Sequence, residues 1–436
     1  MSRFQRFTRW ALLAACLLLF AAGGLLLCLS VGWEGEPFVL LGLMTAAFGG
    51  VLAWFFFADD REGKKDWLTL LLGAAVIGGL ILARLALFPH AARDYNIYLS
   101  DWIAQLRQTE GLSGLALTVG DYNVPYLYLL LAIAKATRHD LYWIKAFSVL
   151  FDLLLAWFAA RLTARWAKSP AAPIAAFAVT LAVPTVLLNG AYWGQCDSVY
   201  AALILGCLLM ALENKSRRAW LLLALAFSFK LQTVFFLPAF LLLLMTGKIK
   251  WRHVWVFPVA FTGLLLPAVI AGRPILDTLS IYVNQTASYP DLVLNAPTLY
   301  RLFGDQSEFA LFQAAALLLT GAATAGLLAL LWQRRERLED RWIDVAYVFA
   351  LLLPFLLPRM HDRYFFLADA LGAVYAFRHP GRWWVPVLTV GASYCGYYYY
   401  LFGASELMPP VLSAALMGAG LIAATHALLK ERKLPA

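Results

Sequence analysis

Residues 10–33, WALLAACLLLFAAGGLLLCLSVGW, form a long run without a charged side chain. An α-helix rises about 1.5 Å per residue, so about 20 apolar residues cross the roughly 30 Å hydrocarbon core of a bilayer. Arg3, Arg6 and Arg9 precede the run. It is too long for a signal peptide and lacks a small-residue cleavage site, so we expect an uncleaved first transmembrane helix.

Similar apolar runs recur to the end of the chain. Of the 436 residues, 62% are hydrophobic and only 14% are charged, whereas soluble domains carry about 25% charged residues. Because the backbone must satisfy its own hydrogen bonds in lipid, we predict an all-α, polytopic transmembrane bundle of about 12 to 14 helices. The expected spans lie near residues 10–32, 38–57, 67–89, 141–163, 171–188, 197–213, 219–246, 253–271, 309–332, 342–358, 364–377, 383–402 and 409–429.

The distribution of Lys and Arg predicts the topology. One set of segments contains 24 of the 35 basic residues and the opposite set contains 6. Cytoplasmic loops are enriched in basic residues, so we expect both termini in the cytoplasm and the two longest loops, 90–125 and 272–307, outside. Because the positive charge is spread over short connections, we expect no nucleic-acid partner. The basic segments are 1–9, 58–66, 161–168, 214–218, 247–252, 333–341, 378–382 and 430–436.

Two apolar segments do not fit simple spans. Residues 125–137, about 13 in number, are too few to cross a bilayer and suggest a re-entrant or half-membrane helix. The segment 219–246 contains Lys230 and Pro238 and has basic flanks, so we predict two half-length helices that meet near Lys230. A charge inside the membrane indicates a functional site or a paired partner. Lys145 and Asp152 are expected to pair with each other or with neighbouring helices.

The outer loop 90–125 holds the acidic side chains Asp94, Asp101, Glu110 and Asp121. The spacing of Ile97, Trp102, Ile103 and Leu106 predicts an amphipathic helix along the membrane surface, with Asp94 at one end and Asp121 at the other. A carboxylate at the mouth of an apolar cavity is suited to act as a general base. The alternative is that these acids are ordinary solvated loop charges.

Two other outer segments carry candidate binding residues. In 189–197, Gln195 and Asp197 are candidates to bind sugar hydroxyls while Trp193 or Tyr192 stacks on the ring; the alternative is an interfacial aromatic beside a helix cap. In 359–364, Arg359 and Arg363, together with Lys230, are candidates to bind a phosphate. The alternative there is that Arg363 pairs with Asp362 or with lipid headgroups.

Three motifs occur together in this order: DYNIYLSDW from Asp94, GDYNVPY from Gly120, and MHDRY from Met360. This combination resembles the GT-C superfamily of polyprenyl-phosphate-sugar-dependent glycosyltransferases. More narrowly, it is similar to the branch with the endoplasmic-reticulum glucosyltransferases of the Asn-glycan precursor and related bacterial mannosyltransferase-like proteins. WGQCD from Trp193 resembles a further outer-face motif. The chain differs in its two extra N-terminal spans, in Asp362 where Glu is usual, and in NVP from Asn123 where two prolines are expected.

The resemblance implies a function and a site. Asp94 corresponds to the catalytic base and Asp121 to a residue that positions substrate. Arg363, with His361, Lys230 or Arg359, would stabilise the departing phosphate. The side chains expected at the sugar or acceptor are Tyr95, Trp193, Gln195, Asp197, Asp362 and Tyr364.

The reaction implied is an inverting hexosyl or pentosyl transfer from a polyprenyl-phosphate sugar to a glycan, lipid or protein acceptor, without a nucleotide site or an obligatory metal cofactor. A bacterial inner membrane is the expected location. We expect one domain over 1–436, with accessory spans in 1–66, a catalytic module in 67–271 and C-terminal spans in 272–436.

A polyprenyl-linked glycan transporter or flippase is the alternative function, because broken helices and charges near the membrane midplane are also found in transport pathways. A non-catalytic assembly subunit is a third.

Overall fold

A computed structural model of the chain describes residues 1–60, 64–120, 122–284, 291–303, 309–403 and 406–430. The structure is 78% helical, and the only strands in the described ranges are β1 (Val293–Leu294) and β2 (Met360–His361). The all-α fold predicted from the sequence is therefore confirmed.

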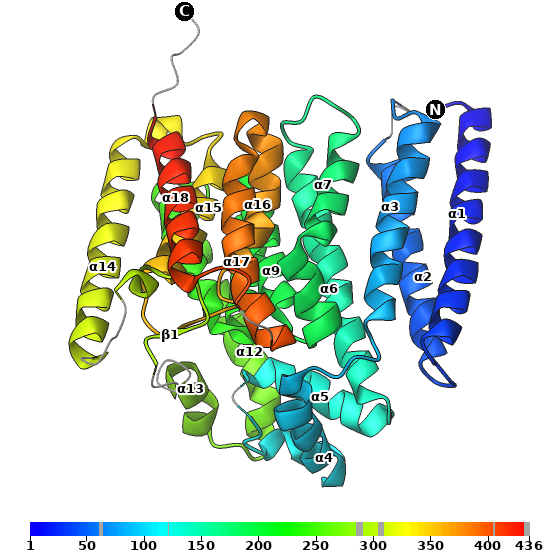
Figure 1. Cartoon of the computed structure of the whole chain (residues 1–436), viewed down its shortest axis with the longest axis horizontal. Helices are drawn as coiled ribbons and strands as arrows, with labels where there is room; N and C mark the ends of the chain where they lie inside the picture. Colours follow the sequence, from blue (N-terminus) through cyan, green and yellow to red (C-terminus); the bar gives the residue numbers. More distant parts are fainter. Residues whose placement is uncertain (61–63, 121, 285–290, 304–308, 404–405, 431–436) are drawn as a thin grey trace, which may run out of the picture.

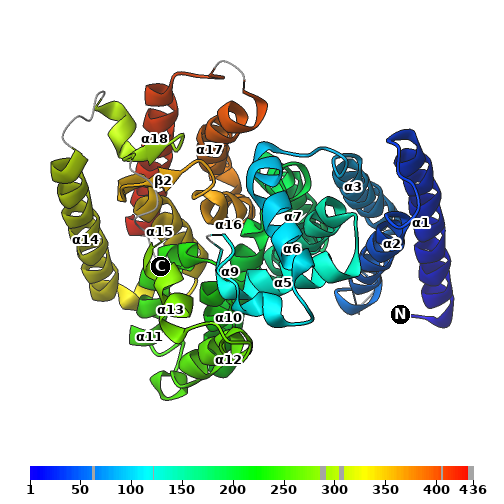
Figure 2. The same cartoon turned by 90° about the horizontal axis from the view of Figure 1, so that it is seen from below.

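Seven helical segments in the described part are long and apolar enough to cross a bilayer, which identifies a membrane protein. Three of them, α1–α3, stand beside the main bundle at one edge, and α14 lies at the opposite edge (Figures 1 and 2). The seven are α1 (Arg3–Ser30), α2 with its π-helical extension (Phe38–Ala58), α3 (Trp67–Ala86), α6 (Asp140–Thr163), Trp251–Ile270 with α12 (Val256–Ile270), α14 (Phe309–Gln333) and α18 (Pro410–Leu429).

The predicted span 171–188 is bent. Helix α7 (Ala172–Ala182) and the helical segment Pro184–Trp193 meet at 62°. Pro184 has no backbone N–H, and its ring clashes with the preceding turn, so a straight helix ends before it. The second segment consists of α8 (Pro184–Leu187) and a π-helix (Leu188–Trp193).

Several other predicted spans are shorter than a bilayer core. Helix α9 lies in the middle of the bundle and is buried on nearly all sides, between α6 and α10. A helix buried in protein does not need the full bilayer length, because its ends contact protein rather than water. These shorter helices are α9 (Asp197–Leu212), α10 (Ser216–Phe229), α11 (Leu237–Met245), α15 (Trp342–Leu356) and α16 (Phe366–Arg378). Helix α17 (Trp384–Phe402) is longer, with 19 residues.

The structure shows the predicted short helix near residues 125–137 and the predicted break near Lys230. Helix α5 (Val124–Ala136) has 13 residues. Helix α10 ends at Phe229, Lys230 is extended with φ −149° and ψ 134°, and a 3-10 helix (Leu231–Phe236) leads into α11. The break at Lys230 interrupts the backbone hydrogen-bond ladder in the interior of the bundle and points this side chain into the protein.

The predicted amphipathic helix after Asp94 is also present, but it ends at Gln108 and does not extend towards residue 121. A π-helix (Tyr95–Leu99) continues into α4 (Ser100–Gln108), which packs on α5 at the end of the bundle away from the N-terminus and the end of α18 (Figure 1). Leu99, Ile103 and Leu106 are buried, whereas Ile97 is 47% exposed. The second long loop contains α13 (Ile275–Asn284) and β1.

The intramembrane charges of α6 pair with neighbouring helices and not with each other. Lys145 Nζ donates to the backbone carbonyls of Leu87 at 2.8 Å and His90 at 2.5 Å. Asp152 forms a fully buried ion pair with Arg84 Nε at 3.0 Å. These contacts join α6 to α3, so they hold the N-terminal helices against the bundle.

Candidate active site

A cavity of about 470 Å³ lies where the outer loop, the broken helix and the α15–α16 turn meet. Its wall combines segments that are far apart in the chain. They contribute side chains from residues 93–102, 122–123, 193–195, 229–232, 294–295, 361–364 and Tyr400. The cavity thus brings together the acidic loop, the intramembrane lysine and the third motif.

Asp94 is held in this wall by three hydrogen bonds. Its Oδ2 accepts from Trp193 Nε1 at 2.9 Å and from Gln195 Nε2 at 2.8 Å. Its Oδ1 accepts from the Tyr400 hydroxyl. A carboxylate has about four lone-pair sites, so Oδ1 retains capacity for one more donor. The side chain is 13% exposed, which leaves it reachable from the cavity.

The backbone around residue 194 orients the side-chain N–H groups of Trp193 and Gln195 towards Asp94. The π-helix that ends at Trp193 is followed by Gly194 with φ +80°, a left-handed conformation that favours glycine. The N–H of Gln195 then donates to the carbonyl of Asn189 at 2.8 Å. This tight turn places the side chains of Trp193 and Gln195 on the same carboxylate oxygen.

Two cations, Arg363 and Lys230, face the carboxylates of Asp94 and Asp197. Arg363 Nη1 lies 3.8 Å from Asp94 Oδ2, and its Nε lies 3.9 Å from Asp197 Oδ2. Lys230 forms an ion pair with Asp197 Oδ1, and both side chains are buried. Asn189 Nδ2 donates to Asp197 at 2.7 Å. The charge of Asp197 therefore balances that of Lys230, whereas Arg363 approaches its two carboxylates only at 3.8 and 3.9 Å.

The third motif is positioned by the small parallel sheet. Leu294 pairs with His361 in the register β1–β2. Burial, and then the positive charges of Arg363 and Lys230, lower the pKa of His361 to about 3, so this imidazole is neutral at pH 7. Burial raises the pKa of Asp362 to about 7, although Arg363 opposes the shift. The backbone N–H of Arg363 donates to Asp362 at 2.9 Å.

The indole of Trp193 is enclosed. It is 1% exposed, Tyr400 stacks on it with ring centroids 4.9 Å apart, and the Arg363 guanidinium lies over the ring at 5.4 Å. The sequence assigned Trp193 and Gln195 to the sugar. In the structure both side chains use their N–H groups to hold Asp94.

Not every predicted residue reaches the cavity. The Tyr95 hydroxyl donates to Asp140, behind the wall, and Tyr95 does not line the cavity. Arg359 has a left-handed φ of 62° and directs its guanidinium to Gln313 of α14 at 3.4 Å. Tyr364 lines the cavity. Asp121 lies outside the described residues.

Sequence reasoning gave no site role to five aromatic side chains of the wall, which are Tyr98, Trp102, Tyr122, Phe229 and Tyr400. Tyr122 donates to Gln195 Oε1 at 2.6 Å, and Lys230 lies over its ring at 5.6 Å. Tyr400 contacts Asp94, and Tyr98 forms part of the wall. The run of four tyrosines at 397–400 is an unusual pattern that could have indicated a functional segment. Nothing in the sequence, however, links the end of α17 to Asp94.

The side chains around the cavity combine a carboxylate, Asp94, with a guanidinium, Arg363. One oriented carboxylate with a spare acceptor site lies beside a guanidinium that can exchange its partner, and aromatic side chains and neutral polar groups surround both. Among the described residues, no group of three or more His, Cys, Asp or Glu side chains has the arrangement of a metal site. The site is suited to removing a proton from one group while binding an anion next to it.

Comparison with known proteins gives the family. The model of glycosyltransferase family 87 matches residues 122–358, more than half of the chain. No curated protein matches the chain at a significant level. The matched range includes Gln195, Asp197 and Lys230, whereas Asp94 precedes it and Arg363 follows it. The chain belongs to glycosyltransferase family 87, a family with GT-C-like character.

Proposed function

We propose that this glycosyltransferase moves a sugar from a polyprenyl-phosphate donor to a hydroxyl of a lipid-linked glycan, polysaccharide or protein, with inversion at the anomeric carbon. The observation that carries this proposal is the 3.8 Å approach of Arg363 to Asp94 within one cavity. A base for the acceptor and a cation for the leaving phosphate are thereby adjacent.

Asp94 acts as the general base. The acceptor hydroxyl donates its hydrogen bond to the remaining acceptor site on Oδ1, while Trp193 and Gln195 keep Oδ2 fixed. As the acceptor oxygen bonds to the anomeric carbon, its proton passes to Asp94. A base that is already oriented loses little conformational entropy when the substrate binds.

Arg363 stabilises the leaving group. The bond from the anomeric carbon to the phosphate oxygen breaks, and its electron pair stays on the phosphate. Arg363 releases its long contact with Asp94 and binds the phosphate oxygens, with Lys230 as the second cation beyond Asp197. His361, neutral at pH 7, offers a hydrogen bond and no charge. A single phosphate is matched by these cations without an obligatory metal.

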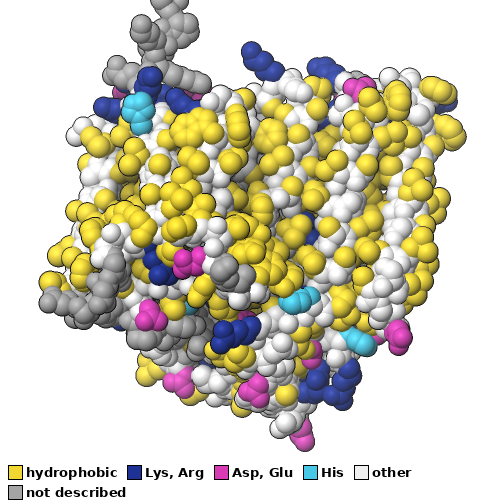
Figure 3. Space-filling model, viewed as in Figure 1, with side chains coloured by type: hydrophobic (Ala, Val, Ile, Leu, Met, Phe, Trp, Pro, Cys, Tyr) yellow, Lys and Arg dark blue, Asp and Glu magenta, His cyan; other side chains and the backbone are white. Residues whose placement is uncertain are grey.

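The outer face of the membrane is the proposed location of the site. The N-terminus, the α6–α7 connection and the end of α18 lie at the end of the bundle opposite to α4 (Figure 1), and Lys and Arg side chains gather along that edge (Figure 3). If the enrichment of basic residues marks the cytoplasm, α4 and the cavity face the other side. This orientation suits a donor lipid that presents its sugar outside.

The test compares purified wild type with Asp94→Asn on a polyprenyl-phosphate sugar and candidate acceptors. Asp101→Asn is the matched control, since Asp101 lies on the exposed face of α4 and bonds only to Gln105 at 2.8 Å within the described contacts. General-base catalysis contributes about 10²- to 10⁴-fold, so Asp94→Asn should lose activity by that factor while the control stays near the wild-type rate.

The product decides between the remaining alternatives. Inversion is checked by the anomeric configuration of the product in NMR spectra. Equal turnover by wild type and Asp94→Asn would refute the mechanism. Movement of a labelled lipid across vesicles without a new glycosidic bond would instead support a flippase.

A further inference from the structure

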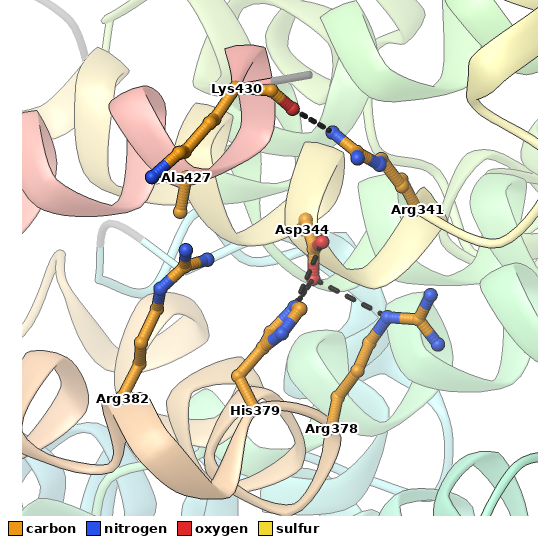
Figure 4. Close-up of a pocket in the computed structure, with 7 residues that line it drawn as sticks. All are labelled: Arg341, Asp344, Arg378, His379, Arg382, Ala427 and Lys430. Carbon is orange, nitrogen blue, oxygen red and sulfur yellow. Dashed lines mark hydrogen bonds and ion pairs between the residues drawn. The ribbon is translucent and has the colours of Figure 1, made fainter. Parts of the chain in front are cut away.

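A second cavity, of about 350 Å³, lies at the opposite end of the α15–α16 hairpin. The turn of this hairpin carries Arg363, whereas its open ends carry Asp344 and Arg378. Helix α16 has 13 residues, so about 20 Å separates the two ends. The lining residues are Arg341, Asp344, Arg378, His379, Arg382, Ala427 and Lys430 (Figure 4).

The charges in this cavity are unbalanced. Four permanently cationic side chains line it, against one carboxylate, Asp344. Asp344 is already engaged: His379 Nε2 lies 2.9 and 3.0 Å from its two oxygens, and Arg378 Nε lies 3.6 Å from Oδ1. The negative charge of Asp344 is thus balanced by His379 and Arg378, and the remaining lining side chains leave the cavity with a net positive charge.

The end of α18 does not cancel that excess. Helix C-termini carry partial negative charge on their last carbonyls. Here Arg341 Nη1 donates to the carbonyls of Leu428 at 2.6 Å and Lys430 at 3.3 Å, which satisfies those groups. Arg382, from the 3-10 helix Pro380–Arg382, and Lys430 lie on either side of Ala427 (Figure 4). Neither forms an ion pair with a carboxylate among the described residues.

The position of the cavity indicates that lipid headgroups are the anions within its reach. Trp383 and Trp384 directly follow Arg382 and are 59% and 42% exposed. Exposed tryptophans at the end of a membrane helix lie at the level of the lipid headgroups. The cavity is much larger than the roughly 30 Å³ share of one water molecule, and Ala427 gives it an apolar edge.

We infer that this cavity binds the phosphate of an anionic lipid headgroup, with Arg382 and Lys430 as its principal ligands. Arginine matches phosphate oxygens through two parallel N–H donors, and lysine adds a point charge. Because the cavity lies at the far end of the bundle, this inference does not depend on the proposed transfer reaction.

The experiment uses the purified full chain in a non-ionic detergent, titrated with phosphatidylglycerol, phosphatidylcholine or inorganic phosphate. Native mass spectrometry counts the bound lipid, and the unfolding midpoint reports stabilisation. Wild type should retain phosphatidylglycerol in preference to phosphatidylcholine. Loss of a hydrogen-bonded charged partner should weaken that binding by about tenfold in Arg382→Gln.

The control variants distinguish a specific lipid-binding site from general electrostatic attraction between lipids and basic side chains. Arg218→Gln removes an exposed charge at the start of α10, outside the cavity, and should leave binding unchanged. Arg382→Lys should keep part of the affinity, and Lys430→Gln should weaken it even if Arg382→Gln does not fold. Equal binding by all variants, an equal loss in Arg218→Gln, or the same Arg382-dependent stabilisation by inorganic phosphate alone would overturn the inference.

Discussion

The side-chain amide of Gln195 lies 2.8 Å from Oδ2 of Asp94, although the two residues are 101 positions apart in the chain. The carbonyl of the same amide accepts from Tyr122 at 2.6 Å. Gln195 therefore links the start of α5 to Asp94, and both ends of its amide are occupied. The orientation of Asp94 is set by side chains from separate parts of the bundle, which makes it open to test without changing Asp94 itself.

Tyr400→Phe should lower kcat with a smaller change in KM. The substitution removes the donor to Asp94 Oδ1 and keeps the ring that stacks on Trp193. A hydrogen bond to a charged group is worth about 1.5 to 3 kcal/mol, so we expect a loss of about tenfold or more. Steady-state kinetics measure it. Tyr398→Phe is the control, since that ring packs on Tyr394 and Phe402; an equal loss there would contradict a specific role of Tyr400.

The Lys230–Asp197 pair should behave as a coupled unit. Lys230→Met leaves a buried carboxylate without its main cation, which costs about 3 to 5 kcal/mol. Lys230→Met combined with Asp197→Asn should recover most of the stability, because no unpaired charge remains. Unfolding midpoints of the single and double variants measure the coupling. If the double variant also regains activity, Lys230 does not contribute to binding of the leaving group.

Gly396→Ala should disturb the cavity wall. A Cβ at Gly396 would lie 2.5 Å from the backbone oxygen of Asn295 and 3.2 Å from Asp362 Cβ, so the segment after β1 must move. We expect a severalfold loss of activity. Gly391→Ala in the same helix meets nothing within 4 Å and should be neutral or stabilising by about 0.5 to 1 kcal/mol. Similar activity of the two variants would show that the β1 segment tolerates displacement.

Asp362→Asn should change how stability depends on pH. Burial raises the pKa of Asp362 from its ordinary value near 4 to about 7, so the folded protein holds this proton more tightly than the unfolded chain. Stability contributed by the protonated form is lost as pH rises through that window. The unfolding midpoint of Asp362→Asn minus that of wild type should therefore increase between pH 4 and 7 and then level off. A constant difference would contradict a buried, protonated Asp362.

The fold was largely predictable because hydropathy and charge are local signals. The break at Lys230 followed from a charge inside an apolar run with basic flanks, and the short α5 followed from its length. The bend at Pro184 was missed, since a proline can also lie inside a helix that continues past it, as Pro267 does in α12. The lengths of α9, α15 and α16 depend on burial by neighbours, which no local pattern reports.

The site was predictable in part. The motifs identified Asp94, Gln195, Asp197 and Arg363, and the charge inside an apolar run identified Lys230. Four of these residues line one cavity, whereas Asp197 is buried and pairs with Lys230. Their contacts were not predictable, because Trp193 and Gln195 use on Asp94 the donors that the sequence assigned to a sugar. Tyr95 and Arg359 belong to the same motifs, yet the backbone directs them elsewhere.

The pairing of β1 with β2 has a consequence for how substrate preference can change. β2 belongs to the hairpin that carries Arg363, whereas β1 belongs to the long loop, and Leu294 and Asn295 from that loop line the cavity. Two residue pairs form the parallel register, Asn295 adds a bridge to His361, and the N–H of Arg359 donates to the carbonyl of Leu292 at 2.7 Å. A loop transplanted from a related enzyme that keeps this short register would alter the cavity wall formed by Leu294 and Asn295 and leave Asp94, Lys230 and Arg363 in place. The shape of that wall can therefore change without a change in these three side chains.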